Sequence, residues 1–465
     1  MNKLKIFKNI GLVALSNITT VISGILVGFL IPKIMSVDSY GYYKTFTLYA
    51  TYTGFFSLGM VDGIVLKYGG YNYDELNKRS FRSIFRVYIL LHVFFFIVLC
   101  FISFFLNDSK YTFIIINLAL FMVAGNITGF FQQISQITQR FKEYSARRII
   151  QSLLNIVLVM MLFIFFKVGY EIDYKIYTGI WVMINIVLMF WYIITYKDLV
   201  FGEGIRLKTI RSDVKSLIII GFPLLFANLC STLILNLDRQ FVNILFDNST
   251  YAVYAFAYNM LALVTVATSA VSTVLYPTLK RVSKEAMMGN YSKLIGTMLA
   301  LVFGANILYF PLCIFIRWFL PKYSESLVIF RIIFPGLAIT SAITVVMHNY
   351  YKALEENFKY FKKSIIILVL SAVANYLAYS CFKTTISISI ASIVVMIFWY
   401  LFIEQFLINK TKSNRFKNLG YLLIMMMVFY GTTVIDNVYI SMLLYLSVYV
   451  VVTYFFIGKE RLKKK

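Results

Sequence analysis

Charged residues are scarce in this sequence, and so are the residue types on which most catalytic and metal sites depend. Only 14% of the 465 residues are charged, and there are two histidines and four cysteines. His92 and His348 have no partner pattern suited to acid–base catalysis. The cysteines stand singly in apolar stretches, without the spacing of a metal site or a disulfide framework. We therefore predict that the chain is not an enzyme and holds no metal or resident cofactor.

Long apolar runs fill most of the sequence. Sixty per cent of the residues are apolar, and runs of about 20 residues, enough for a helix to cross the ~30 Å hydrocarbon core, recur from end to end. The runs are continuous and do not alternate, which indicates helices and excludes a β-barrel. We predict an all-α polytopic membrane protein with about fourteen spans. The predicted spans cover residues 10–33, 44–67, 84–106, 111–138, 149–167, 176–196, 216–238, 250–278, 294–316, 326–351, 364–382, 384–406, 418–436 and 438–457.

Basic residues mark the predicted cytoplasmic side. With the N-terminus placed in the cytoplasm, most of the 44 Lys and Arg residues fall in the termini and in every second connection. Lys and Arg are retained on that side of a membrane, so we predict that both termini are cytoplasmic. This placement accounts for the net charge of +24, because the basic residues then form a cytoplasmic face that lies against anionic lipid headgroups. A nucleic-acid partner is not expected, because the basic residues lie at span ends and form no aromatic-rich patch.

One helix–loop–helix stretch occurs twice, first over residues 11–67 and again over residues 221–277. Further segments match after the corresponding spans: Asn72–Leu76 with Asn290–Leu294, and Gln139–Lys142 with Glu356–Lys359. Because six spans, an even number, separate the copies, the repeat predicts two parallel, pseudo-symmetric six-helix lobes facing a shared cavity. The predicted parts are residues 1–205 and 206–410 for the lobes, and residues 411–465 for two extra helices with a basic tail.

Several short motifs together resemble the polysaccharide flippases of the Wzx type. This superfamily also holds multidrug and toxin extruders and lipid II flippases. The motifs are Ser57–Gly63 in the second span, Asp238-Arg239 at the end of the seventh, the helix start with Tyr251 and Tyr254, Tyr276-Pro277 at the end of the eighth, and Pro321-Lys322-Tyr323 before the tenth.

The resemblance implies a function. It implies a flippase that moves an undecaprenyl-pyrophosphate-linked oligosaccharide, such as an O-antigen or capsule repeat unit, across the bacterial cytoplasmic membrane by alternating access. Na⁺ or H⁺ is the candidate coupling ion. The expected partners are the lipid-linked oligosaccharide and membrane lipids, with a glycan polymerase and other envelope-assembly proteins as candidates.

Two other transporter functions stay open at this point, namely a cation-coupled multidrug antiporter and a lipid II flippase. The first span has no charged residue between Lys8 and Lys33, whereas the lipid II flippases carry arginines facing their cavity. Drug extruders have twelve spans and lack the last pair, for which we expect a role in holding an isoprenoid tail. A membrane-bound polymerase or ligase is disfavoured, because such enzymes need a sizeable outer loop and all outer segments here are short.

Polar side chains inside the spans are the candidate site residues, since an ionisable group there costs roughly 2.5–3.5 kcal/mol unless it faces a cavity or a partner. Asp62 is either a cavity acid for a coupling cation or sugar hydroxyl, or a structural partner of Lys67. Amides, hydroxyls and tyrosines suit sugars, although the same groups also join helices within a bundle. The predicted cavity residues are Asn17, Asp62, Gln132, Gln136, Asn228, Thr232, Asn236, Tyr254, Tyr258, Asn259 and Arg331.

Cations near the outer ends of the spans form a second group of candidates. Arg331 lies close in sequence to Arg317 and Lys322, and pyrophosphate or acidic sugars need such groups. A gating or ion-pair role is assigned to Asp238, Arg239 and Lys44.

Overall fold

The computed structural model describes residues 3–261, 275, 279, 282–411 and 415–458. These residues form helices and connections, with no strand among them. The chain divides into two compact units, Met1–Leu229 and Cys230–Lys465, and the division falls inside a long helix, α9 (Leu207–Leu245). The predicted three-part division, and a cavity shared by two lobes, stay predictions.

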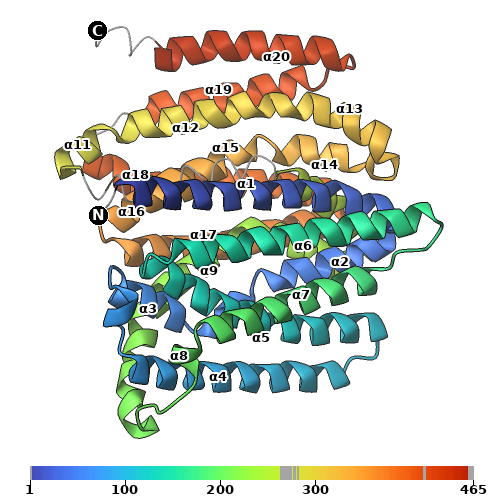
Figure 1. Cartoon of the computed structure of the whole chain (residues 1–465). Helices are drawn as coiled ribbons and strands as arrows, with labels where there is room; N and C mark the ends of the chain where they lie inside the picture. The colour runs from blue at the N-terminus through green and yellow to red at the C-terminus, as the bar shows by residue number, and fades with distance from the viewer. Residues whose placement is uncertain (1–2, 262–274, 276–278, 280–281, 412–414, 459–465) are drawn as a thin grey trace. The chain divides into compact units, whose positions relative to one another are not determined.

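In Figure 1 the long helices within each unit run roughly side by side. Besides the first part of α9, the N-terminal unit contains α1 (Lys3–Ile34), α2 (Val37–Ala50), α3 (Met60–Tyr68), α4 (Lys78–Phe104), α5 (Ser109–Ile137), α6 (Phe141–Lys167), α7 (Tyr174–Thr195) and α8 (Lys197–Val200). The C-terminal unit contains the rest of α9, then α11 (Lys284–Gly289), α12 (Tyr291–Ala305), α13 (Tyr309–Phe319), α14 (Ser326–Ile333), α15 (Gly336–Ser341), α16 (His348–Ala353), α17 (Asn357–Phe382), α18 (Thr385–Thr411), α19 (Arg415–Thr432) and α20 (Val438–Thr453).

The helices confirm the all-α polytopic membrane fold. Within the described ranges, ten helices are long and apolar enough to cross a membrane, and a bent pair, Ser326–Ile333 with Gly336–Ala353, makes an eleventh. The predicted thirteenth span is present as the shorter α19. The predicted eighth span runs into residues outside the described ranges, and its closing Tyr276-Pro277 lies among them.

The predicted second span is not one continuous helix, which corrects the sequence prediction. It comprises α2, a short 3₁₀ turn (Thr53–Ser57) and α3, and the break falls where Leu58 and Gly59 adopt positive φ angles of 50° and 81°. A Cβ on Gly63 would lie 2.1 Å from the Leu217 carbonyl oxygen of α9. Glycine is therefore needed here for the left-handed turn and for the close helix contact. This explains the glycines of the Ser57–Gly63 motif.

The predicted fifth span began at residue 149, but α6 begins eight residues earlier, at Phe141. The added turns contain Arg147 and Arg148, which the prediction had placed in a connection. Arg147 is buried. Its guanidinium donates to the Glu143 carbonyl and the Thr195 hydroxyl and lies over the Trp191 ring, and these contacts compensate for the burial of the charge. A guanidinium with such partners is tolerated inside a membrane bundle.

The predicted tenth span is bent by 45° between α14 and α15. Pro335 lies at the bend, and its ring and missing N–H prevent a regular helix through this point. A π-helical segment (Ala342–Met347) follows. The helices α19 and α20 pack on the rest of the C-terminal unit, where the Tyr445 hydroxyl donates to the Phe303 carbonyl of α12 at 2.6 Å.

Candidate functional site

The N-terminal unit contains an open polar cavity of about 590 Å³, which we call the N-cavity. The predicted cavity residues Gln132 and Gln136 of α5 both line it. It combines amides, hydroxyls and aromatic rings from α1, α2, α5, α6 and α7. Its lining residues are Thr20, Ser23, Gly24, Val27, Tyr43, Gln132, Gln133, Gln136, Tyr144, Arg148, Gln151, Ser152, Asn155, Tyr177 and Trp181.

Arg148 supplies the positive charge of the N-cavity. Its guanidinium donates to the Asn17 amide oxygen at 3.0 Å and to the Tyr144 hydroxyl at 2.8 Å. These acceptors are neutral, and no carboxylate lies within ion-pair distance of Arg148 among the described residues. The predicted cavity residue Asn17, on α1, thus orients the Arg148 guanidinium by accepting its hydrogen bond. The positive charge stays available for an anionic ligand.

Aromatic rings form one wall of the N-cavity. Tyr43 and Tyr177 meet edge to face with ring centres 5.1 Å apart, and Trp181 stacks on Phe121 at 4.8 Å. The neighbouring Lys44 has its ammonium 5.4 Å from the Tyr43 ring centre, which places this predicted gating residue beside the cavity wall. Such rings offer flat apolar faces to the C–H faces of a sugar.

Amide groups complete the N-cavity. Gln151 donates to Asn185 at 3.0 Å, and the Thr20 and Ser152 hydroxyls lie 3.2 Å apart. The buried Asn155 amide oxygen has no hydrogen-bond partner in the described structure. A buried acceptor without a donor costs about 1–3 kcal/mol. A ligand hydroxyl would remove that cost.

The C-terminal unit contains a smaller cavity of about 270 Å³, the C-cavity. Among the described residues that line it, only the predicted gating residue Arg239 is charged, and the predicted cavity residue Tyr258 lies beside it. Apart from Thr340, the other lining residues are apolar or glycine. They are Leu235, Leu261, Ile333, Gly336, Leu337 and Met396.

Asp238 is buried behind the C-cavity in a hydrogen-bonded cluster. Its carboxylate accepts the Tyr254 hydroxyl at 2.8 Å and the Tyr258 hydroxyl. The Arg239 guanidinium lies over the Tyr258 ring, with 4.5 Å to its centre, and bonds to the Asn236 amide. The described contacts therefore join Asp238 to two tyrosines, where the sequence had indicated an ion pair with Arg239.

The other predicted site residues on α9 and the following helix lie elsewhere. Asn236 is buried and donates to the Thr232 carbonyl at 2.7 Å, a bond within its own helix. Asn228 is exposed, and Thr232 and Asn259 are partly buried. None of these four residues lines the N-cavity or the C-cavity.

Asp62 occupies the first turn of α3, where a carboxylate is stabilised by the helix dipole. It is partly buried, and its charge acts on the Tyr88 hydroxyl of α4. The ion pair of Lys67 is with Asp213, at 3.9 Å. The sequence had treated Asp62 as a mid-helix charge because the Leu58–Gly59 break is not visible in the apolar pattern.

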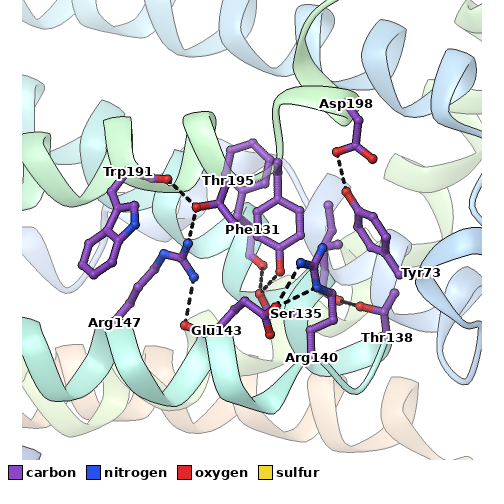
Figure 2. A network of polar contacts seen from close by, with 12 residues as sticks. Tyr73, Phe131, Ser135, Thr138, Arg140, Glu143, Arg147, Trp191, Thr195 and Asp198 are labelled. Carbon is purple, nitrogen blue, oxygen red and sulfur yellow. Dashed lines mark hydrogen bonds and ion pairs between the residues drawn. The ribbon is translucent and has the colours of Figure 1, made fainter.

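A polar network joins three connections at one end of the N-terminal unit (Figure 2). The Tyr73 hydroxyl donates to Asp198 at 2.6 Å, and Lys78 pairs with the same carboxylate at 2.8 Å. The Arg140 guanidinium lies 4.4 Å from the Tyr73 ring centre and pairs with Glu143 at 3.0 Å. These residues hold the helix ends together and are not among the lining residues of the N-cavity.

Arg331 lines a third cavity of about 530 Å³ in the C-terminal unit, together with Arg317. Among the described residues, no group of His, Cys, Asp or Glu is placed to hold a metal ion.

Sequence analysis missed several N-cavity residues, above all Arg148, Gln151 and Asn155. They share one face of α6 because they are spaced by three and four residues, and this spacing was readable in the sequence. It was overlooked because Arg148 had been assigned to a connection before the fifth span.

Solved structures with a similar fold are membrane transporters. A lipid II flippase, MurJ, in an inward-closed conformation matches with a TM-score of 0.71 and 15% identity, over 97% of this chain and 99% of that one. An inward-facing multidrug resistance transporter of the MATE family matches with a TM-score of 0.57 and 12% identity, over 86% and 96%. A MATE transporter of Vibrio cholerae gives 0.57 and 12%, over 88% and 97%. At these identities the likeness concerns the fold.

Family membership comes from the sequence. No protein of curated function matches the chain significantly. The family model described as polysaccharide biosynthesis protein matches residues 6–283, more than half of the chain. This match, with the fold of the lipid II and MATE transporters, confirms the resemblance suggested by the short motifs. The chain belongs to the polysaccharide biosynthesis protein family.

Proposed function

We propose that this protein flips an undecaprenyl-pyrophosphate-linked oligosaccharide, of the kind used for O-antigen or capsule, across the bacterial cytoplasmic membrane. In this proposal it works by alternating access, has both termini in the cytoplasm and performs no covalent chemistry. Na⁺ or H⁺ drives the cycle, with Asp62 as the candidate acid. The substrate is the main partner, beside membrane lipids, a glycan polymerase and other envelope-assembly proteins.

The observation that carries the proposal is the chemistry of the N-cavity. Its volume of about 590 Å³ lies within the ~300–1,000 Å³ typical of ligand pockets. Tyr43, Tyr177 and Trp181 can stack on sugar rings, whereas Gln136 and Asn155 can bond to sugar hydroxyls. A saccharide needs this combination of flat apolar faces and amides.

The charge of the N-cavity supports the same substrate class. Of the described residues that line it, Arg148 alone is formally charged and none is acidic. A guanidinium binds pyrophosphate or an acidic sugar through charge-assisted hydrogen bonds. A site for cationic drugs would need the opposite sign, which disfavours a multidrug antiporter.

A lipid II flippase is the second candidate, because Arg148 supplies a cavity arginine that the first span lacks. One experiment separates the two. The protein is removed from its host, and the lipid-linked glycan that accumulates on the cytoplasmic leaflet is identified by mass spectrometry. Accumulation of a polymer repeat unit supports our proposal, whereas accumulation of lipid II overturns it in favour of the second candidate.

Complementation with variants tests the role of the N-cavity itself. Arg148→Ala should lower export about tenfold or more, since one charge-assisted hydrogen bond contributes roughly 1.5–3 kcal/mol. Lys142→Ala removes a charge from an exposed position of the same helix and serves as the matched control. Equal export by both variants, with equal amounts in the membrane, would argue against the N-cavity as the glycan site.

A further inference from the structure

The third cavity of the C-terminal unit, which we call the arginine pocket, is built from three separate segments. Its walls come from α13, from α14 with the residue Ser324 before it, and from the connection between α19 and α20 with the start of α20. Figure 1 shows that these segments meet at one end of the unit. The volume of about 530 Å³ leaves room for a phosphate group and the first part of a lipid chain.

The walls of the arginine pocket are fixed by hydrogen bonds between helices. The Tyr430 hydroxyl of α19 donates to the Ile332 carbonyl at 2.8 Å, directly beside Arg331. The Ser441 hydroxyl of α20 donates to the Ile435 carbonyl at 3.0 Å and closes the connection between the two helices. The pocket is therefore a regular part of the packed unit.

Two arginines from facing segments supply the charge of the pocket. Arg317 comes from the last turn of α13 and Arg331 from α14. Among the described residues, neither has a carboxylate within 4.0 Å or a hydrogen-bond partner. Cations are uncommon at this end of the spans, because most Lys and Arg residues lie at the opposite ends. Two guanidiniums in one pocket, each with no carboxylate within 4.0 Å among the described residues, indicate that an anion binds there.

The remaining lining groups limit what that anion can be. The hydroxyls of Ser324 and Thr433 already donate to backbone carbonyls at 2.8 Å and 2.9 Å, so the arginines are the main available donors. Beside them, Val328 and Val434 are 41% and 73% exposed. An anion with an attached apolar chain fits this arrangement better than a free anion.

We propose that the arginine pocket binds the phosphate headgroup of an anionic lipid, with Arg317 and Arg331 on the phosphate oxygens and the start of the chain against Val328 and Val434. The proposal deepens the proposed function. It rests on that function only for naming the lipid as an isoprenyl pyrophosphate and for placing the pocket at the outer leaflet. There the pocket would receive the carrier after translocation.

Asp436 gives the pocket an opposing charge. It is exposed on the α19–α20 connection and is the one acidic residue among the described residues that line the pocket. No Lys or Arg lies within 4.0 Å of it in the described structure. Its repulsion weakens anion binding and so allows the lipid to leave again. A mutation at this position should therefore strengthen binding, which a purely structural role does not predict.

The test measures binding to the purified protein in detergent by titration calorimetry. The probes are farnesyl pyrophosphate, inorganic pyrophosphate and farnesol. Wild type should bind farnesyl pyrophosphate most tightly, and Arg317→Ala with Arg331→Ala should weaken this binding tenfold or more. Asp436→Asn should tighten it about threefold. Lys383→Gln, at an exposed cation between α17 and α18, should leave it unchanged.

Each alternative outcome overturns part of the proposal. Equal affinity for inorganic and farnesyl pyrophosphate would identify a free-phosphate site and exclude the lipid. Unchanged binding in the double arginine variant, or weaker binding in Asp436→Asn, would exclude the pocket. The Asp436→Asn result decides the matter if the double variant fails to fold. Loss of binding in the double variant together with accumulation of lipid II on removal of the protein would uphold this site and overturn the proposed function.

Discussion

Tyr73 and Tyr291 occupy matching places in the internal repeat but have different surroundings. Tyr73, in the N-terminal unit, donates to Asp198, which also pairs with Lys78. Tyr291, in the C-terminal unit, is buried and its hydroxyl has no hydrogen-bond partner among the described contacts. The C-terminal unit also has a buried carboxylate, Glu404, but this group accepts hydrogen bonds from Tyr400 and Arg415 and not from Tyr291. The two copies of the repeat therefore share a tyrosine at this position but differ in the hydrogen bonding of its hydroxyl.

The N-cavity and the C-cavity also differ in polarity, and again the N-terminal unit has more polar groups. The N-cavity is larger and lined by amides, aromatic rings and Arg148, whereas the C-cavity is lined mainly by apolar side chains. In the C-terminal unit the buried carboxylate of Asp238 is occupied by Tyr254 and Tyr258. We infer from this comparison that contacts with the glycan are concentrated in the N-terminal unit, while polar groups behind the C-cavity stabilise the fold.

The largest expected effect on stability is at Asp238. Asp238→Ala should destabilise the protein by about 3 kcal/mol, because it leaves two tyrosine hydroxyls in the interior without their charged acceptor. Thermal unfolding in detergent measures this, with the exposed Asp436→Ala as the control. An unchanged unfolding temperature in Asp238→Ala would show that the cluster is not structural.

The next effect concerns export and compares the two cavities directly. Gln136→Leu keeps the side-chain size but removes an amide from the N-cavity, so export should fall about fivefold to tenfold. Thr340→Val makes a similar polar-to-apolar change in the C-cavity and should lower export less than twofold. Surface polymer in complemented cells is the readout. Equal losses would mean that both cavities contact the glycan.

A smaller effect depends on pH and belongs to the N-terminal unit. Partial burial alone would raise the pKa of Asp198, but hydrogen bonds from Lys78 and Tyr73 outweigh it and hold the pKa below its ordinary value of 3.8. A carboxylate with a lowered pKa stabilises the folded state above the ordinary pKa and loses this contribution as the pH falls through the folded value. Unfolding followed from pH 7 to pH 3 should therefore be less pH-dependent in Asp198→Asn. A pH dependence identical to wild type would contradict the role of this network.

The smallest effect is expected at Asn17, which orients Arg148. Asn17→Ala removes one hydrogen bond and should cost about 0.5–1.5 kcal/mol in stability. Export should fall less than in Arg148→Ala, because the guanidinium keeps its bond to Tyr144. Export assays of both variants at matched expression check this order. A stronger defect in Asn17→Ala would mean that Asn17 contacts the substrate itself.

Much of the fold was predictable because membrane helices can be recognised in a sequence by their length and hydropathy. The long helices α1, α4 and α5 follow directly from uncharged runs. The break at Leu58–Gly59 was not predictable from hydropathy, because it depends on a left-handed turn and on contact with α9. The early start of α6 was missed for a related reason, since Arg147 is made tolerable by tertiary contacts with Thr195 and Trp191.

The candidate site was predicted less well than the fold. Gln132, Gln136 and Asn17 were found because polar residues inside a span are conspicuous, and the structure brings them to the N-cavity or to its arginine. Tyr254 and Asp238 were equally conspicuous, but they satisfy each other in the interior. A single sequence cannot tell a polar group that faces a cavity from one that has a partner, because the difference lies in tertiary packing.

The central claim, that the N-cavity contacts the glycan, is tested most directly by photo-crosslinking in cells. A photoreactive amino acid is placed at Gln136 of α5 and, as a control, at Ile116, an exposed apolar position of the same helix. Our account predicts that lipid-linked oligosaccharide is captured at Gln136 and not at Ile116. Capture at Ile116 alone, or equal capture at both positions, would contradict it.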